Sequence, residues 1–477
     1  TPQLVARFRA RFGDAIAVLH SELSERERND AWRALRQGRV DLAIGARSAL
    51  FAPVERLGVV VVDEEHDGSF KQEDGFRYHA RDMALLRAHR AKAVCVLGSA
   101  TPSLESYHLA ETGKLGLLAL PERATPQPLP PVEVIDLARH KAGRSGERLL
   151  SEPLHRALEQ CLAAHEQAIL FLNRRGFAPS VRCNGCGELL QCPSCCVSLT
   201  LHRGARVLRC HYCDFTRQDT GTCIACGSTE LMELGLGTEQ VEHLLARHFP
   251  SARVARLDRD TASGEGVEAV LERLRSGEVD FLIGTQMVTK GHDVPGVTLV
   301  GVMLADQSLA FPDFRAAERT FQLLAQVGGR AGRGVKPGRV ILQTYLPEHP
   351  AVRFAKSHDY LGFLRTEQVA RRELGYPPYS RLCAVRIDAV EERVAERAAE
   401  NLARLARAQP AVRQEQVELL GPAPAPMGRL RGRYRYRFML KSTERRALRA
   451  VAQALLPALA EAAPARASLD IDPVNML

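Results

Sequence analysis

A run of β-branched residues that ends in charged residues constrains the fold of this chain more than any other stretch. Gly58 is followed by four valines, and Asp63, Glu64, Glu65 and His66 come directly after them. An apolar run without polar interruption is typical of a strand buried on both faces of a parallel sheet. Ligands bind at the carboxyl ends of such strands. We therefore expect these acidic residues at the ligand-binding edge of an α/β domain.

Acidic side chains at that edge have a specific chemical use. We expect Asp63 to hold Mg²⁺ and Glu64 to polarise an attacking water, which is the Walker B arrangement of nucleotide hydrolases. An acidic loop that merely follows a core strand is the alternative, and a short motif alone leaves that alternative open.

The region before residue 124 alternates expected strands with helical patterns. A helix is expected over residues 24–38, with Ser24 as N-cap and Glu27 at the capping-box position. Strands are expected at residues 15–19, 40–45, 59–62 and 93–97. The last three of these strands end in the motifs Gly45-Ala46-Arg47-Ser48, Asp63-Glu64-Glu65-His66 and Gly98-Ser99-Ala100-Thr101. Three such coincidences in series favour a nucleotide-dependent machine built from βα repeats.

A second α/β section follows a proline-rich stretch, residues 121–131, which is typical of a linker. Its strands are expected at residues 168–172, 281–284, 297–304 and 339–345. The motif Gln-x-x-Gly-Arg-Ala-Gly-Arg, residues 326–333, precedes the last strand. Phosphoryl transfer needs positive charge at its transition state, and we expect Arg330 and Arg333 to supply it across a cleft between two lobes. Ordinary solvated surface arginines are the alternative.

The cysteines give the strongest local signal. Eight of the twelve form Cys-x-x-Cys pairs, at Cys183/Cys186, Cys192/Cys195, Cys210/Cys213 and Cys223/Cys226. Two such pairs saturate one tetrahedral Zn²⁺, so we expect two structural zinc sites. The spacing leaves open which pairs join, and iron–sulfur ligation and disulfides are the rival interpretations.

The remaining cysteines and the compartment follow from the same pattern. Cys196 adjoins a ligand and competes with Cys195, whereas Cys95, Cys161 and Cys383 lie in apolar contexts typical of core thiols. Cysteines clustered in a long chain indicate metal binding in a reducing compartment, which we expect to be the cytoplasm. The sequence has no apolar stretch long enough to span a membrane and no signal-peptide pattern at its start.

The last hundred residues favour a split βαβ, ferredoxin-like unit. Strands are expected at residues 382–389, 417–420, 433–441 and 468–472, with helices at 391–408 and 443–460. Arginines alternate through this region and would share one face of a strand: Arg429, Arg431, Arg433, Arg435 and Arg437. A solvated edge is one interpretation, and binding to DNA or to the acidic tail of a single-stranded-DNA-binding protein is the other. The net charge of +9 suits a polyanionic partner.

Taken together, these motifs resemble those of the superfamily-two helicases. The resemblance is carried by Asp63-Glu64-Glu65-His66, Gly98-Ser99-Ala100-Thr101, Lys290-Gly291-His292-Asp293 and residues 326–333. Other segments look like the primosomal replication-restart helicases, known as primosomal protein N′. They are His20-Ser21-x-Leu23-Ser24, residues 45–51, Ser69-Phe70-Lys71-Gln72, residues 77–82, residues 170–176 and the cysteine insertion. The resemblance covers essentially the whole chain.

The resemblance implies an architecture and an activity. Two RecA-like parallel-sheet lobes are expected at residues 1–124 and at residues 125–182 with 228–375. A two-zinc insertion is expected at 183–227 and a C-terminal α+β ferredoxin-like domain at 376–477. The activity implied is that of a 3′–5′ DNA helicase, dependent on ATP and Mg²⁺, that recognises and remodels stalled replication forks and initiates primosome assembly. The implied partners are branched and single-stranded DNA, single-stranded-DNA-binding protein and other primosome proteins, with no membrane.

The resemblance also assigns residues. Gly291, Asp293 and Gln326 would complete the nucleotide contacts, and the outer cysteine pairs would share one zinc while the inner pairs share the other. Residues 69–82 resemble an aromatic-rich loop that senses single-stranded DNA. Its side chains fit base stacking and phosphate pairing, although a loop with packing aromatics is the alternative: Phe70, Lys71, Arg77, Tyr78 and Arg81. Contacts to the DNA backbone are expected from Arg47, Ser48, Thr285, Gln286 and Lys290.

One feature departs from that family. Its members carry a Gly-x-x-x-x-Gly-Lys-Thr phosphate loop before a Thr-Pro-Gln segment, and this sequence starts at Thr1-Pro2-Gln3 with no Gly-Lys-Ser/Thr loop elsewhere. We therefore expect an N-terminally truncated helicase core, with ATP hydrolysis belonging to the longer protein. A catalytically inactive scaffold that binds DNA and proteins is the alternative. A different translocase, such as a restriction or RNA helicase, is disfavoured by the zinc insertion.

Overall fold

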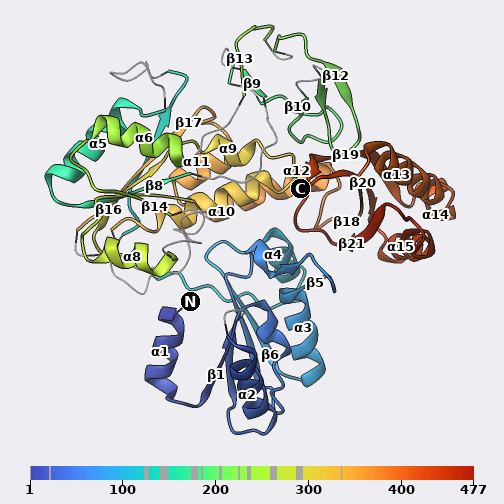
Figure 1. Ribbon diagram of the computed structural model, residues 1–477, viewed down its shortest axis with the longest axis horizontal. Helices are drawn as coiled ribbons and strands as arrows, with labels where there is room; N and C mark the ends of the chain where they lie inside the picture. Colours follow the sequence, from blue (N-terminus) through green and yellow to red (C-terminus); the bar gives the residue numbers. More distant parts are fainter. Residues whose placement is uncertain are drawn as a thin grey trace. The chain divides into compact units, whose positions relative to one another are not determined.

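The computed structural model is drawn in Figure 1. It describes residues 2–20, 23–122, 128–139, 149–172, 181–183, 186–187, 189–202, 207–223, 226–233, 238–257, 266–285, 294–332, 334 and 336–476. Two compact units make up the chain, Thr1–Leu117 and Leu118–Leu477, and each has its own packing. The finer domain boundaries expected at residues 182, 228 and 375 stay predictions.

The first unit is built from parallel strand pairs and short helices. The order is α1 (Pro2–Phe12), β1 (Ile16–Leu19), α2 (Glu25–Arg36), β2 (Leu42–Gly45), η1 (Arg47–Phe51), β3 (Val59–Asp63), η2 (Gly68–Phe70), β4 (Lys71–Gln72), β5 (Tyr78–His79), α3 (Ala80–Ala91), β6 (Val94–Gly98) and α4 (Leu104–Glu111). β1 pairs with β2 and β3 with β6, both in parallel, and β4 and β5 form an antiparallel hairpin. The expected capping box at the start of α2 is present, with Ser24 and Glu27 bonded to each other's backbone.

The expectation that β3 is buried on both faces is wrong. Val59 and Val61 are 55% and 64% exposed, and they lie opposite Val94 and Val96 of β6, which are exposed as well. Val62 is buried, and α3 packs against both strands. Successive side chains of a strand point to opposite faces. In the described part of the chain, one face of the β3–β6 pair is therefore covered and the other presents valines.

The second unit contains a six-stranded parallel sheet in the order β14-β15-β8-β16-β17-β7. The strands are β7 (Val132–Asp136), β8 (Gln167–Phe171), β14 (Val254–Leu257), β15 (Phe281–Gly284), β16 (Val297–Val302) and β17 (Arg339–Thr344). Every residue of β8, β15 and β16 is buried. Continuous burial of this kind is what helices on both faces of a parallel sheet produce. The two edge strands, β14 and β7, were not expected from the sequence.

Helices cover both faces of this sheet (Figure 1). α5 (Glu152–Ala163) and α6 (Thr238–His248) pack on one face, where Leu154 and Val241 belong to the same buried apolar cluster as Phe281. α8 (Val267–Arg275), α10 (Ala316–Gly328) and α11 (Pro350–Lys356) pack on the other, where Phe321 belongs to the same buried apolar cluster as Leu282. The short helix α9 (Asp306–Leu309) precedes α10, and α12 (Tyr360–Glu373) leads out of this layer toward the last domain.

The cysteine-rich segment lies between β8 and α6 and contains only short strands among its described residues. β10 (Thr200–His202), β11 (Val207–Arg209) and β12 (Thr216–Gln218) form an antiparallel sheet, and β9 (Val181–Cys183) pairs with β13 (Leu231–Glu233). Such small sheets bury little apolar surface, so other contacts must hold this segment together.

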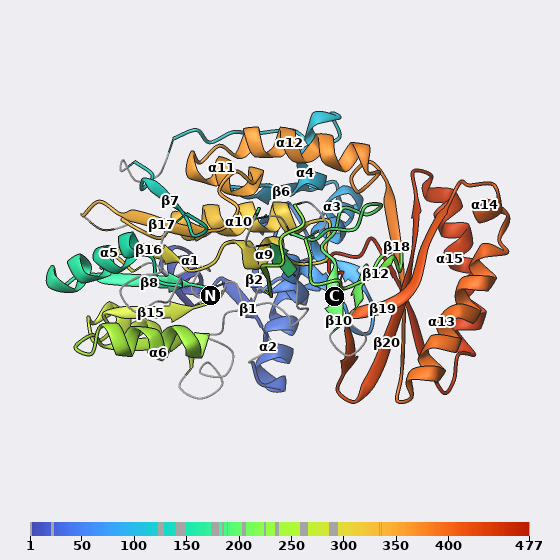
Figure 2. The ribbon, with the colours of Figure 1, turned by 90° about the horizontal axis from the view of Figure 1, so that it is seen from above.

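The C-terminal region confirms the expected ferredoxin-like order. Its elements are β18 (Arg381–Ala389), α13 (Glu392–Arg407), α14 (Pro410–Arg413), β19 (Glu418–Leu430), β20 (Arg433–Ser442), α15 (Arg445–Ala460) and β21 (Arg466–Ile471). The four strands form an antiparallel sheet in the order β19-β20-β18-β21. α13 and α15 lie together on one face of it (Figure 2). None of the helices that the structure describes has the length and apolar character needed to cross a membrane.

The alternating arginines of this region do not share one strand, contrary to the expectation. β19 ends at Leu430 and β20 begins at Arg433, so the five arginines span a hairpin whose turn contains Arg431 at φ +50°. Arg429 lies against the ring of Tyr434, and Arg437 is 5% exposed. The reversal at Arg431-Gly432 breaks the period-two pattern on which the single-face interpretation depended.

A close backbone approach explains one glycine of the 326–333 motif. Gly332 has φ +69°, and a Cβ atom on it would lie 2.4 Å from the backbone nitrogen of Gly338. Its own N–H donates to the carbonyl of Val297, which ties the motif to β16. Only glycine fits a left-handed position with backbone this close.

We predict that Gly332→Ala destabilises the chain by about 1–3 kcal/mol, because left-handed strain and a backbone overlap both oppose the new methyl group. Denaturant unfolding of the wild type and the variant measures the change. Gly58→Ala is the control, since a Cβ there meets no atom within 4 Å. Equal loss of stability in both variants would contradict the explanation.

Candidate metal, nucleotide and DNA sites

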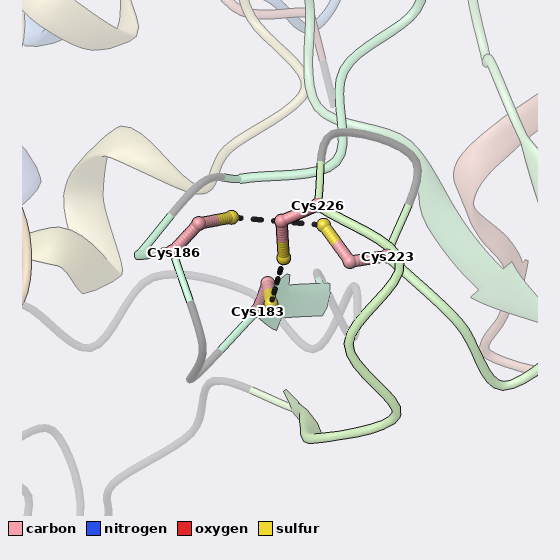
Figure 3. A group of neighbouring side chains, drawn as sticks. All are labelled: Cys183, Cys186, Cys223 and Cys226. Carbon is pink, nitrogen blue, oxygen red and sulfur yellow. Dashed lines mark hydrogen bonds between the residues drawn. The ribbon is translucent and has the colours of Figure 1, made fainter.

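The outer cysteine pairs converge on one point. The sulfurs of Cys183 and Cys226 lie 3.6 Å apart, and those of Cys186 and Cys223 lie 3.7 Å apart. All four sulfurs lie within 4.8 Å of one another and turn toward a common centre (Figure 3). Four sulfurs at about 2.3 Å from a tetrahedral Zn²⁺ are separated by about 3.8 Å. The outer group therefore fits a closed zinc site, with Cys186 and Cys226 on its exposed side.

The inner pairs converge in the same way. Cys192, Cys195, Cys210 and Cys213 have their sulfurs within 4.8 Å of one another, and those of Cys192 and Cys213 are 3.6 Å apart. Three of the four are buried and Cys213 is half-buried. The structure thus brings the eight cysteines together as two groups, outer with outer and inner with inner. Spacing alone left that pairing open.

All four Cys-x-x-Cys turns share one backbone geometry. The carbonyl of each first cysteine accepts from the N–H four residues later, which belongs to Gly187, Cys196, Asp214 and Gly227. Each of these four residues has a positive φ, between +51° and +79°. Cys196 therefore occupies the position that glycine fills in two of the turns. It belongs to neither sulfur group, and Cys161 and Cys383 are buried as core residues.

The turn of Cys210 and Cys213, which belongs to the inner cysteine group, packs against the C-terminal sheet. The ring Nδ1 of His211 lies 2.7 Å from the carbonyl oxygen of Pro424 in β19, and the guanidinium of Arg437 in β20 donates to the carbonyl of His211. Burial lowers the pKa of Arg437 to about 10. On the other side, the hydroxyl of Tyr212 accepts from the backbone N–H of Phe314, just before α10. The inner site is thus built into the junction of three parts of the second unit.

Two further sets of contacts lie at this junction: an aromatic stack, and hydrogen bonds from four arginines to backbone carbonyls near the C-terminus. Phe314 stacks on Tyr376 with ring centroids 4.5 Å apart, and the Tyr376 hydroxyl donates to the carbonyl of Cys195. Four consecutive backbone carbonyls near the C-terminus each accept from an arginine. The pairs are Arg315 with Pro473, Arg319 with Val474, Arg386 with Asn475 and Arg437 with Met476.

The acidic motif of the first unit stands where the sequence predicts, at the carboxyl end of β3. Asp63 pairs in register with Gly98 of β6, and its carboxylate accepts from the N–H of Glu64 at 3.0 Å. Glu64 has φ +51°, and both carboxylates are exposed. The ring Nδ1 of His66 lies 2.7 Å from the hydroxyl of Ser99. The motifs at the ends of β3 and β6 are therefore joined side by side.

The third acidic residue of the motif differs from the other two. Glu65 is 1% exposed, and its carboxylate accepts from the N–H and hydroxyl of Ser103 and from the hydroxyl of Ser106. Arg81 also donates to it, at 3.2 Å. The sequence groups Arg81 with phosphate-pairing residues, but the structure turns its guanidinium inward to Glu65 and Ser103.

The hairpin of β4 and β5 carries the aromatic residues expected to meet DNA. Phe76 is 74% exposed, and its ring stacks on that of Tyr78 with centroids 5.8 Å apart. Phe70 is half-buried and Lys71 is buried. Sequence reasoning missed Phe76, although a phenylalanine next to Gly75 at the tip between two short strands is a recognisable signal.

Two arginines of this region donate hydrogen bonds to backbone carbonyls of the same unit. Arg47 donates to the backbone carbonyls of Ser69 and Lys71, and Arg77 donates to that of Glu73. Ser48 is exposed on η1. Their expected contacts with DNA stay predictions.

The structure describes only some of the nucleotide- and DNA-contacting residues expected in the second unit. Gln326 is in the last turn of α10, Arg330 follows that helix, and Thr285 follows β15; all three are half-buried. Five other expected residues lie outside the described part of the chain: Gln286, Lys290, Gly291, Asp293 and Arg333. Because Asp63 and Arg330 belong to different units, the expected split site stays a prediction.

Known proteins match the same segments. Residues 192–218 match the family model described as the PriA DNA helicase Cys-rich region domain, and residues 372–474 match the primosomal protein N C-terminal domain. Replication restart protein PriA of Bacillus subtilis is 45% identical over 457 residues, covering 96% of this chain and 56% of that protein. The same-named protein of Treponema pallidum is 39% identical over 477 residues, covering 100% and 71%. The chain belongs to the replication restart protein PriA family.

The chain spans only part of the length of its relatives. The chain spans 56%, 54% and 64% of the length of the relatives from Bacillus subtilis, Synechocystis and Haemophilus influenzae. A solved structure of RecG bound to a three-way DNA junction has a TM-score of 0.42 and 15% identity, covering 77% of this chain and 38% of that one. A likeness at that level adds nothing to the family assignment.

We predict that the purified chain binds two Zn²⁺ and that Cys210→Ser lowers its thermal unfolding midpoint more than Cys226→Ser does. The inner site joins three parts of the unit, whereas Cys226 is exposed. Metal analysis and thermal unfolding measure both effects. Cys196→Ser is the control and should retain two ions, because Cys196 lies outside both groups. Loss of zinc in that control would overturn the assignment.

Proposed function

We propose that this chain is the core of an ATP-dependent DNA helicase that moves 3′ to 5′, remodels stalled replication forks and initiates primosome assembly. One observation carries the proposal. In a chain of the PriA family, Asp63 and Glu64 stand exposed at the carboxyl end of a parallel strand, beside the Gly98-Ser99 end of its neighbour. That edge is where open α/β sheets bind ligands.

The acidic pair suits a magnesium nucleotide. Mg²⁺ is usually held by one or two carboxylates together with waters and substrate phosphates. Asp63 would be the metal-holding carboxylate, and Glu64 would orient and deprotonate the attacking water. Bound Mg²⁺–ATP supplies the phosphoryl group whose transfer to water drives movement. Nucleotide contacts from the second unit would come from Gly291, Asp293, Gln326, Arg330 and Arg333.

Exposed aromatic and basic groups suit a nucleic acid. A base can stack on the exposed face of Phe76, and stacking of this kind tolerates any sequence. Backbone contacts would come from Arg47, Ser48, Thr285, Gln286 and Lys290, and the net charge of +9 favours a polyanion. The arginines of the C-terminal hairpin, with Arg431 exposed on its turn, would contact DNA or the acidic tail of single-stranded-DNA-binding protein.

We also propose that the cysteine-rich segment binds two structural Zn²⁺ ions. It has too little apolar sequence to fold without metal, and we infer that it separates strands at the fork or docks other primosome proteins. Replication restart takes place on the chromosome, so the cytoplasm is the proposed compartment.

A second candidate is a scaffold that binds DNA and proteins without hydrolysing ATP. The observation that favours it is the lack of a Gly-Lys-Ser/Thr phosphate loop anywhere in the sequence. Comparing DNA-stimulated ATP hydrolysis by this chain and by a version extended to the length of its relatives separates the two candidates. If neither version hydrolyses ATP, the helicase proposal is wrong.

We predict that Asp63→Asn in the extended protein lowers the rate constant of DNA-stimulated ATP hydrolysis by about 100-fold or more, because a charge that acts on the transition state is lost. The DNA dissociation constant should stay unchanged. Asp41→Asn, which alters an exposed aspartate outside the motif, is the control. A wild-type rate in Asp63→Asn would remove Asp63 from the mechanism.

We predict that Phe76→Ala weakens binding of single-stranded DNA by about 1–3 kcal/mol, the usual contribution of one stacked base. Fluorescence anisotropy with a labelled oligonucleotide measures it. Phe12→Ala removes another exposed phenylalanine, on α1, and should leave binding unchanged. Equal affinities for wild type and Phe76→Ala would place the DNA elsewhere.

A further inference from the structure

The backbone of residues 473–476 is bound by arginines from two different parts of the second unit. Arg315 is the N-cap residue of α10 and Arg319 is in its first turn, so both belong to the parallel-sheet lobe. Arg386 is in β18 and Arg437 in β20, so both belong to the C-terminal sheet. The first two donate to the carbonyls of residues 473 and 474, and the other two donate to those of residues 475 and 476. One half of the segment is therefore held by the lobe and the other half by the C-terminal domain.

The side chain of Met476 lies between the same two parts. It is 1% exposed and belongs to the buried apolar cluster that contains Phe314 and Tyr376. Phe314 comes just before α10, and Tyr376 is in the connection between α12 and β18. The same cluster includes Met439 of β20. Removing an apolar side chain from water is favourable, so Met476 stabilises the contact between lobe and domain.

Buried carboxylates hold the arginines in place. Asp313 is 1% exposed, and it accepts from the guanidinium of Arg319 at 2.7 Å and from the N–H of Arg315 at 2.9 Å. Asp470 is also 1% exposed and lies 3.3 Å from the guanidinium of Arg386. Burial opposes the charge of Asp313, but Arg319 and Arg315 outweigh burial and lower its pKa. Because these guanidinium groups are already ordered, binding the segment costs little side-chain entropy.

The residue before the segment directs the chain from the sheet toward the lobe. β21 is an edge strand that pairs with β18. Asp472 follows it at φ +48°, a left-handed conformation that persists only where neighbouring contacts impose it. Its N–H donates to the carbonyl of Leu382 at 2.9 Å, and its carboxylate lies 3.6 Å from Arg381. The direction in which residues 473–476 leave β21 is therefore fixed by β18.

We propose that residues 473–476 form a latch that fastens the C-terminal domain to the parallel-sheet lobe, so that the two move as one body. Arginines at the start of α10 hold one half of the latch, arginines of the C-terminal sheet hold the other half, and Met476 packs between them. A movement of the lobe then carries with it the C-terminal sheet and the turn of Cys210 and Cys213 that packs on this sheet. The latch requires neither nucleotide nor DNA, and it does not depend on the proposed helicase activity.

The test is hydrogen exchange, followed by mass spectrometry, on the full-length protein without nucleotide or DNA. Met476→Ala removes the apolar side chain of the latch. Arg315→Met removes the hydrogen bond to the carbonyl of residue 473 but keeps an apolar side chain beside Phe314. In each variant we expect peptides that contain Phe314 or Tyr376 to exchange at least about tenfold faster, the effect of losing one hydrogen bond to a charged group. Exchange in β15 and β16 should stay at the wild-type rate.

Two control variants separate release of the latch from other effects. Val474→Ala shortens a half-buried side chain of the latch but keeps the backbone carbonyl, so exchange should match the wild type. Met303→Ala removes a fully buried methionine from a different apolar cluster of the lobe. It should leave exchange at Tyr376 unchanged, although it opens a cavity in the lobe.

Each other outcome would overturn the latch. If Met476→Ala and Arg315→Met exchange like the wild type at both peptides, residues 473–476 do not fasten the domain. If exchange accelerates equally in β15 and β16, the variants have lost overall stability and no specific release has occurred. If Val474→Ala accelerates exchange as much as Arg315→Met does, recognition through the carbonyls is wrong. The helicase proposal is tested separately by ATP hydrolysis, and none of these results alters it.

Discussion

The convergence of four cysteine sulfurs on one point is the interaction on which much of the second unit depends. The cysteine-rich segment has strands of three residues each, which cannot form a stable core alone. Once its turns are closed, Tyr212 and His211 present fixed groups to the loop before α10 and to the C-terminal sheet. Arg437 connects that sheet to the carbonyl of His211 and to that of Met476. The surface formed around the inner cysteine group is thus the one on which the larger elements pack.

The first unit has a buried polar network at the end of β3. The three acidic residues at the end of β3 divide into an exposed pair and one buried anchor. Glu65 receives donors from two helices, and His66 reaches Ser99 beside them. Polar networks of this kind hold a single arrangement when every member is bonded. The same turn therefore presents two exposed carboxylates while its third is buried and held in place.

Sequence reasoning succeeded where the signal is local. The capping box of Ser24 and Glu27, the strand at residues 281–284 and the order of the ferredoxin-like elements depend on neighbours within a few residues or on simple periodicity. It failed where distant partners decide. Glu65 is indistinguishable from Glu64 in the sequence, because its burial depends on Ser103 and Ser106, 38 and 41 residues away.

Other failures have the same origin. The valines of β3 predict burial on both faces, yet which face is covered depends on what packs beside the strand pair. β19 continues to Leu430 through Pro422 and Pro424, residues that normally end a strand, because it lies at the sheet edge and contains register shifts. Which cysteine pairs share a group can be seen only in the structure, because all four pairs have the same Cys-x-x-Cys spacing.

The arginine clamp at the chain end acts on main-chain oxygens and not on side chains. Each of the four arginines contacts the carbonyl of a different consecutive residue, from Pro473 to Met476. Every amino acid offers the same carbonyl, so this recognition is insensitive to which residues occupy those positions. It does depend on the number of residues. Inserting or deleting one residue between Ile471 and Pro473 would place each carbonyl oxygen opposite a different guanidinium, so these contacts require a segment of fixed length.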